Sequence, residues 1–201
     1  MRERRPLIRS SQVRSNLAAV RRLDDPVVVS DILDELGETI VSWLETSAVP
    51  LWIPMEVDQQ LFSAIHGRAG KQGVRLCGRA AMLEVAGLPS FRPLVQATVR
   101  VFGLSPSSLF RLGPKAWHYA VRNAGELVYL GGDDDAPQLR YVDAPASVLD
   151  DETYVHSIAA SLEAAIWYAG LRGEVTWTIG KDGIDFRGTW NEGRSSGALG
   201  A

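Results

Sequence analysis

The clearest hydrophobic pattern lies near the C-terminus, on either side of the turn at Gly180–Gly183. Apolar and polar side chains alternate there, as they do in a strand with one buried face. The apolar positions are Val175, Trp177, Ile179, Ile184, Phe186 and Trp190. The pattern predicts a β-hairpin. Gly188 falls on the apolar face of this hairpin, where the missing side chain leaves room for a close neighbour.

A shorter alternating pattern precedes it and predicts a second hairpin around residues 131–137. Its apolar positions include Leu127, Tyr129, Leu139 and Tyr141. The connecting segment contains the acidic run Asp133–Asp135, which on its own suggests a divalent-metal loop. Adjacent carboxylates lack the spaced ligands of a calcium loop. We therefore interpret the run as a solvated turn.

Between the two hairpins, helical spacing predicts a helix from about Asp151 to Ala169. The residues of its apolar stripe are Val155, Ile158, Leu162, Ala165, Ile166 and Ala169. Asp150 is the expected N-cap and Gly170 follows at the expected stop. Together the helix and the hairpins predict an α+β fold, with N-terminal helices packed on a small twisted antiparallel sheet.

Other faces of this helix carry small residues, which let a second helix approach closely. These residues are Ser157, Ala160, Ser161 and Ala164. The second helix could belong to the same chain, which we favour, or to a partner subunit. Trp167 and Tyr168 lie off the apolar stripe and form a candidate contact patch with Ala160, Ser161 and Ala164, since aromatic residues are enriched in interface cores. Burial against neighbouring helices is the competing interpretation.

The N-terminal half is predicted to be mostly helical. Apolar spacing and proline positions place helices at about 13–23, 26–46, 55–65, 74–85, 90–102, 106–112 and 114–124. The segment His66–Gly73 holds glycines and basic residues, which invites a phosphate-loop interpretation. It has neither the Walker A spacing nor a preceding parallel strand. We therefore expect an ordinary loop between helices.

The 201 residues suffice for one domain with a sizeable core. Residues 1–22 contain seven Arg and one Glu, a net charge of +6, so a whole-chain charge of −3 leaves −9 on the remainder. We predict a basic N-terminal arm (1–24) that contacts an acidic surface, a domain (25–190), and a disordered tail (191–201). The arm lacks interleaved aromatic residues, so nucleic-acid binding is not expected. Without a membrane span or a signal peptide, the default location is the cytoplasm.

Chemistry-bearing residues are scattered. The three histidines, His66, His118 and His156, lie in different segments and lack metal-site spacing, and Cys77 is the single cysteine. No metal site and no catalytic constellation are predicted, so the chain is not expected to be an enzyme. An enzyme would need a polar pocket that joins residues such as His66, Arg68, Glu84 or Asp182. His118, beside Trp117 and Tyr119, is the candidate haem ligand, against a structural role for the same side chain.

Several short segments follow one another in an order that carries a resemblance. They are Leu51–Pro54, Leu104–Pro106, Leu112–Trp117, the hairpin start at Gly125, the helix from Tyr154 to Gly170, and the final strand with Phe186 and Trp190. Over about residues 50–190 the chain resembles a myxobacterial paralogous family of uncharacterised proteins. That family is similar to vinyl-reductase-like domains, to TRAPP vesicle-tethering subunits and to haem nitric-oxide-binding domains.

The resemblance implies helices packed on one side of a twisted antiparallel sheet, dimerisation, and a space between helices and sheet for a haem or an acyl chain. The Tyr-x-Ser-x-Arg haem motif and a cysteine or histidine cluster are missing from the sequence. We therefore expect a non-enzymatic binding, regulatory or assembly module without a cofactor. Its expected partner is another protein or a second copy of the chain, with a small hydrophobic ligand as a further option. The alternative hypothesis is a haem or small-molecule sensor domain.

Overall fold

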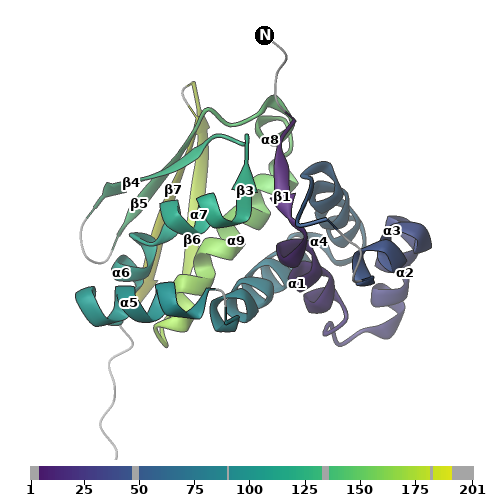
Figure 1. The fold of residues 1–201 in the computed structure, drawn as a ribbon, viewed down its shortest axis with the longest axis horizontal. Coiled ribbons are helices and arrows are strands. Elements are labelled where there is room, and N and C mark those ends of the chain that lie inside the picture. The colour runs from purple at the N-terminus through teal and green to yellow at the C-terminus, as the bar shows by residue number, and fades with distance from the viewer. Residues whose placement is uncertain (1–4, 47–49, 90, 133–135, 182, 192–201) are drawn as a thin grey trace, which may run out of the picture.

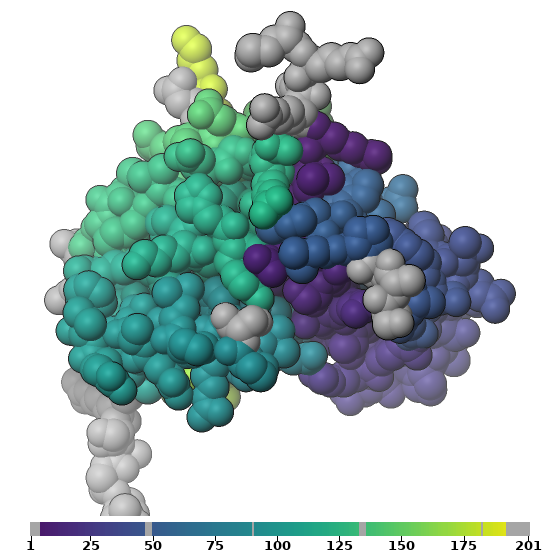
Figure 2. Space-filling view, in the orientation of Figure 1, coloured from purple at the N-terminus to yellow at the C-terminus, as the bar shows by residue number. Residues whose placement is uncertain are grey.

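The chain folds as a group of helices beside a four-stranded antiparallel sheet, in a computed structural model (Figure 1). The structure describes residues 5–46, 50–89, 91–132, 136–181 and 183–191. The predicted α+β class is confirmed. Helices up to residue 46 gather at one end of the molecule in the space-filling view (Figure 2).

The four-stranded sheet contains both predicted hairpins. Its strands are β4 (Glu126–Gly131), β5 (Gln138–Val142), β6 (Arg172–Gly180) and β7 (Gly183–Asn191). Their order is β4-β5-β7-β6, so the two hairpins join through β5 and β7. The long helix α9 (Glu152–Tyr168) packs on β6 and β7. The acidic run at 133–135 lies outside the described residues.

The apolar face of the C-terminal hairpin is buried at Val175, Ile184 and Phe186, whereas Ile179 beside the turn is 45% exposed. Trp177 pairs with Phe186, and Val175 pairs with Gly188. A Cβ atom on residue 188 would stand 2.7 Å from Cζ of Phe110, closer than carbon atoms can approach. Gly188 therefore gives Phe110, in helix α6 (Pro106–Phe110), its place against the sheet.

Three short strands form a second sheet that the sequence pattern does not predict. Strand β1 (Leu7–Arg9) lies between β2 (Trp52–Pro54) and β3 (Val121–Arg122), and both pairings are antiparallel. The predicted helix at 114–124 is therefore wrong at its end. Helix α7 (Gly113–Ala120) stops where Val121 takes extended backbone angles.

The predicted long helix at 26–46 is also wrong, because it is broken at Gly37. Helix α2 (Pro26–Leu36) begins after Asp25, whose side chain accepts from the amides of Val27 and Val28. Gly37 has a φ of 88°, which favours glycine and ends the helix. Helix α3 (Glu38–Glu45) follows immediately in a new direction.

Helix α4 (Glu56–Gly87) replaces the predicted loop at 66–73. Its backbone leaves helical geometry at Gly70 alone, where φ is 63° and ψ is −169°. The predicted helices at 55–65 and 74–85 are therefore confirmed as the two halves of α4, and a kink at Gly70 connects them in place of a loop. The backbone at Gly67 and at Gly73 stays helical.

The remaining helices pack mainly on α4, α6 and α9. They are α1 (Ser10–Val20), α5 (Arg92–Phe102) and the short α8 (Ala146–Leu149). Helix α9 begins one residue later than predicted, because Asp151 is its N-cap and accepts from the amide of Tyr154 at 2.9 Å. Asp150, the predicted cap, instead ends α8.

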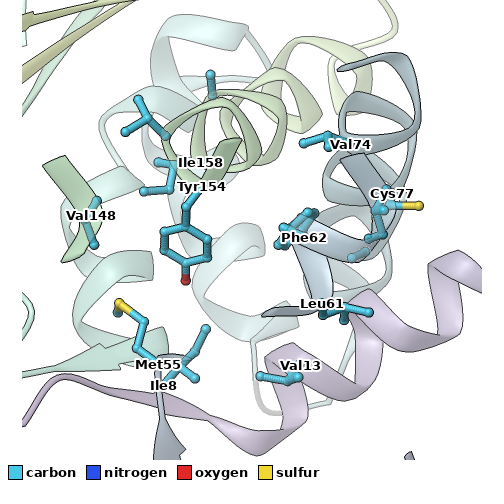
Figure 3. Packing of buried hydrophobic residues seen from close by; sticks show 14 of the residues in the cluster. Ile8, Val13, Met55, Leu61, Phe62, Val74, Cys77, Val148, Tyr154 and Ile158 are labelled. Atoms are coloured by element: carbon cyan, nitrogen blue, oxygen red, sulfur yellow. The ribbon is translucent and has the colours of Figure 1, made fainter. Parts of the chain in front are cut away.

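The main hydrophobic core runs from α1 through α4 to α9 (Figure 3), and it includes buried residues of the sheet such as Leu139 and Phe186. Val13 of α1 is fully buried in it. Residues 7–20 of the predicted basic arm thus form β1 and α1 inside the fold, while the boundaries of arm, domain and tail stay predictions. A second, smaller core lies under α5 and includes Phe91 and Val95. None of the described helices is long and apolar enough to cross a membrane.

Candidate functional site

A cavity of about 140 Å³ lies between α9 and the helices α1, α4, α5, α6 and α7. Its wall is mainly apolar and includes Phe62, Met82, Leu112, Ala116, Ile158 and Leu162. For comparison, an engineered apolar cavity of about 150 Å³ accepts a benzene molecule. The space is thus suited to a small apolar group.

The lining of the cavity follows most of the length of α9. Its lining residues on α9 run from Tyr154 to Tyr168, which at the helical rise corresponds to about 21 Å. Tyr168 is 41% exposed, whereas Tyr154 is buried. The cavity therefore extends from the buried start of α9 to the surface at its end.

The kink in α4 allows both halves of this helix to line the same cavity. Asp58 before the kink and Ala86 after it both line the cavity. In an unbroken helix these residues would lie about 42 Å apart, far more than the length of α9 that lines the cavity. Because the chain turns at Gly70, both halves of α4 contribute to one cavity.

A polar cluster closes the buried end of the cavity. Asn16 of α1 donates from Nδ2 to Oδ1 of Asp58 at 2.7 Å, and the Tyr154 hydroxyl donates to Oδ2 at 3.0 Å. Gln12 donates from Nε2 to the Asn16 side chain at 3.3 Å. All four residues line the cavity. The hydrogen bonds thus run from α1 and α9 toward one carboxyl group.

Burial dominates the titration of this cluster. Asp58 is 3% exposed, and loss of hydration raises its pKa from 3.8 to about 6, although the bonds from Asn16 and Tyr154 act in the opposite direction. Burial and the adjacent Asp58 charge raise the pKa of Tyr154 well above its ordinary value. Above about pH 6, Asp58 is therefore a carboxylate facing a neutral phenol.

Among the described residues, Asp58 has no ion-pair partner. The sequence interpretation missed this residue. A signal was present, because Asp58 falls on the same helical stripe as Leu61, Phe62 and Ile65. A carboxylate on an apolar stripe is either paired or functional.

A separate charged cluster lies between α4 and β6. Glu163 is 1% exposed, and its Oε1 accepts from Nε of Arg75 and from the amide of Val175, each at 3.1 Å. Its Oε2 accepts from Arg79 at 3.3 Å. The guanidinium of Arg79 also lies 3.9 Å from the Trp167 ring centre, and that of Arg172 lies 3.7 Å from it. This network holds α4, α9 and β6 together.

His118 lies on α7 but points away from the cavity. Its side chain is exposed, whereas the preceding Trp117 lines the cavity and donates from Nε1 to the carbonyl of Gly125 at 3.1 Å. Its role as a haem ligand thus stays a prediction that the cavity wall does not support.

The predicted contact patch on α9 divides between the interior and the cavity. Ala160 and Ala164 are buried, and a Cβ atom on Gly78 of α4 would stand only 3.0 Å from the Ala160 methyl. The helix that packs closely against the small residues of α9 is therefore α4 of the same chain. Ser161 and Tyr168 line the cavity, and Trp167 is half-buried beneath Arg79 and Arg172. A role of these residues in an interface stays a prediction.

Two residues that an enzyme's polar pocket would need, Arg68 and Glu84, form ion pairs with different partners. Arg68 pairs with Asp31 and Glu35, and Glu84 pairs with Arg22. Asp182 lies outside the described residues. In the part of the chain that the structure describes, no group of three or more His, Cys, Asp or Glu side chains could hold a metal ion.

Solved structures with a similar fold are H-NOX domains. The Fe(II) unliganded H-NOX protein from K. algicida matches with a TM-score of 0.61 and 10% identity, covering 92% of this chain and 97% of that one. An oxygen-binding H-NOX domain related to soluble guanylate cyclases matches with a TM-score of 0.57 and 14% identity, over 91% and 95%. No protein-family model matches the chain, and no curated protein matches its sequence.

A third neighbour, from work on haem redox potential and porphyrin distortion, has a TM-score of 0.56 and 13% identity over 90% of this chain and 99% of that one. These likenesses show the fold and support the predicted similarity to haem nitric-oxide-binding domains. They contradict two other expectations. The prediction of an assembly module and the prediction of no cofactor are both wrong, because the neighbours with this fold are haem-binding sensor domains.

Proposed function

We propose that this chain is a sensor domain that binds a small molecule in the cavity beside α9. The observation that carries the proposal is an apolar cavity with one polar end, inside a fold shared with H-NOX domains. Ligand pockets have this composition, in which apolar walls bind and a few polar groups orient. No catalytic step is assigned to the chain.

Haem is the first occupant to consider, and the cavity wall suits it only in part. Apolar side chains would fit the faces of a porphyrin. However, no described residue that lines the cavity is a histidine or a cysteine. Iron ligation would fall to Met82 or to a tyrosine, and burial of Tyr154 raises its pKa, which opposes the phenolate that ligation requires.

Volume is the second mismatch with haem. A cavity of about 140 Å³ compares with the space of about 150 Å³ that accepts one benzene ring, whereas haem is a macrocycle of four linked pyrroles. The residues present therefore do not fit haem, and we assign the cavity to a smaller, elongated ligand.

A haem sensor is the second candidate function, favoured by the names of the structural neighbours. Titration of the purified protein with hemin separates the two candidates. We expect no stoichiometric Soret band that survives gel filtration. A retained Soret band at one haem per chain would replace the smaller ligand with haem.

The cavity itself can be tested with 1-octanol as an apolar probe, measured by calorimetry. Ala165→Leu places extra carbon atoms in the cavity wall, whereas Ala97→Leu makes the same change on the exposed side of α5. We expect Ala165→Leu to weaken octanol binding at least tenfold and Ala97→Leu to leave it unchanged. Equal binding by both variants, or no binding by the wild type, would overturn the proposal.

Other aspects of the sequence interpretation stay predictions. These are the likeness to the myxobacterial, vinyl-reductase-like and TRAPP families, a location in the cytoplasm, and the identity of a protein partner.

A further inference from the structure

The Asp58 carboxylate, at the end of an apolar cavity, can accept more hydrogen bonds than the structure gives it. An ionised carboxylate offers about four lone-pair positions, and the structure shows bonds from Asn16 and Tyr154 alone. Both donors are neutral side chains. The negative charge is therefore hydrogen-bonded but not neutralised by any described cation.

An uncompensated buried charge costs several kcal/mol, so a cation that reaches Asp58 would gain a large interaction. No described Lys or Arg side chain lines the cavity. Below about pH 6 a proton neutralises the carboxylate, and above that pH a bound molecule that enters along α9 is a further source of positive charge. Its charged group must end at Asp58, and the rest must be apolar to match the wall.

The shape of the cavity restricts the apolar part. The path from Tyr154 to Tyr168 is about 21 Å along α9, yet the volume is only about 140 Å³. A small volume that is spread along this length of helix suits a single extended hydrocarbon chain better than a bulky ring system. Ile158, Leu162 and Ala165 follow one another along this path.

We infer that the ligand is a linear alkylamine, with its ammonium group on the Asp58 carboxylate and its hydrocarbon chain along α9. This inference rests on the proposed function, because it names the ligand class of the same cavity. Asn16 and Tyr154 orient the carboxylate toward the ammonium group, and Gln12 orients Asn16 in turn.

A purely structural role for the Asn16–Asp58–Tyr154 cluster makes a different prediction. It would tie α1, α4 and α9 together without selecting any charged ligand. The two interpretations separate when the head group of the probe changes while its chain stays the same. Three probes with eight-carbon chains, n-octylamine, 1-octanol and octanoate, make this comparison.

Calorimetric titrations at pH 8 and about 0.15 M salt keep Asp58 ionised and screen surface charges. We expect octylamine to bind the wild type at least tenfold more tightly than octanol, and octanoate at least tenfold more weakly. Asp58→Asn should bind octanol as the wild type does but lose the preference for the amine. Asp34→Asn removes the same charge from the exposed surface of α2 and should keep the preference.

Each outcome decides between the two proposals. If octanol binds and octylamine binds no more tightly, the amine inference is wrong while the cavity stands. A preference for the amine that survives Asp58→Asn also overturns the inference. If none of the three probes binds the wild type, the proposed function itself fails. Octanol binding by Asp58→Asn shows that this variant is folded.

Discussion

The Phe110 ring occupies the position that a side chain on residue 188 would need. A Cβ atom there would stand 2.7 Å from Cζ of Phe110 and 3.1 Å from Cε1. Phe110 is 1% exposed and also lines the apolar cavity, so its ring would have to shift toward the cavity and give up its packing against β7.

Gly188→Ala should therefore destabilise the protein by about 1–3 kcal/mol, the usual cost of overpacking. Urea unfolding measures the change. Gly87→Ala is the matched control, because a Cβ atom there meets nothing within 4 Å. Equal stability of the two variants would contradict the close packing of Phe110 on β7.

Glu163 should be the most costly carboxylate to neutralise. It is buried and accepts from Arg75, Arg79 and the Val175 amide. Glu163→Gln leaves Arg79 without its counter-charge, and Arg75 keeps only its pair with the exposed Glu174. We therefore expect a loss of about 3 kcal/mol in the free energy of unfolding.

Glu152→Gln provides the comparison for this loss. Its pair with Lys71 is exposed on both sides, with 66% and 68% of the side chains accessible. Exposed pairs contribute less than about 1 kcal/mol. If both substitutions cost the same in chemical denaturation, Glu163 is not the centre of a buried network.

Asp58 should make the protein less stable as the pH rises. Its pKa in the folded protein is about 6, against 3.8 for a free side chain. The unfolded chain therefore releases the proton first, and stability contributed by protonated Asp58 is full below about pH 4 and lost as pH rises to about 6. The difference corresponds to a loss on the order of 3 kcal/mol.

Asp58→Asn removes the pH dependence that this carboxyl group contributes. The free energies of unfolding of the wild type and the variant are therefore compared at each pH. Urea unfolding at intervals from pH 4 to pH 7 should show the wild type losing stability relative to the variant. A constant difference over that range would mean that Asp58 titrates as an exposed group does.

Cys77 should be inert in the folded protein. It is buried in the core, and burial raises the pKa of its thiol from 9.0 to about 12. The thiolate that reacts with disulfide reagents is thus rare. Labelling with a chromogenic disulfide at pH 8 should be slow in buffer and rapid in urea. Rapid labelling without denaturant would place the thiol at the surface.

Local patterns predict the elements that depend on local interactions. The hairpin of β6 and β7 follows from alternation around a glycine turn, and α9 follows from its apolar stripe. Strand β1 gives no such signal. It has only three residues, and its partners β2 and β3 are about 45 and 114 positions away along the chain, so its pairing is decided by tertiary packing.

The site could be predicted only in part. Sequence reasoning placed a possible hydrophobic pocket between helices and sheet, but selected His118 as its polar residue. Adjacent helical positions point about 100° apart, so Trp117 faces the cavity and His118 faces solvent. Asp58 and Asn16 are separated by 42 positions, and nothing local indicates that they meet.

Gly70 touches no part of the cavity wall, yet the direction of α4 on either side of it determines how far apart the two halves of that wall stand. The separation of the two halves of the wall is therefore set by a backbone angle at a residue that does not line the cavity. Related chains could acquire wider or narrower cavities by altering this one joint, with all contact residues kept the same.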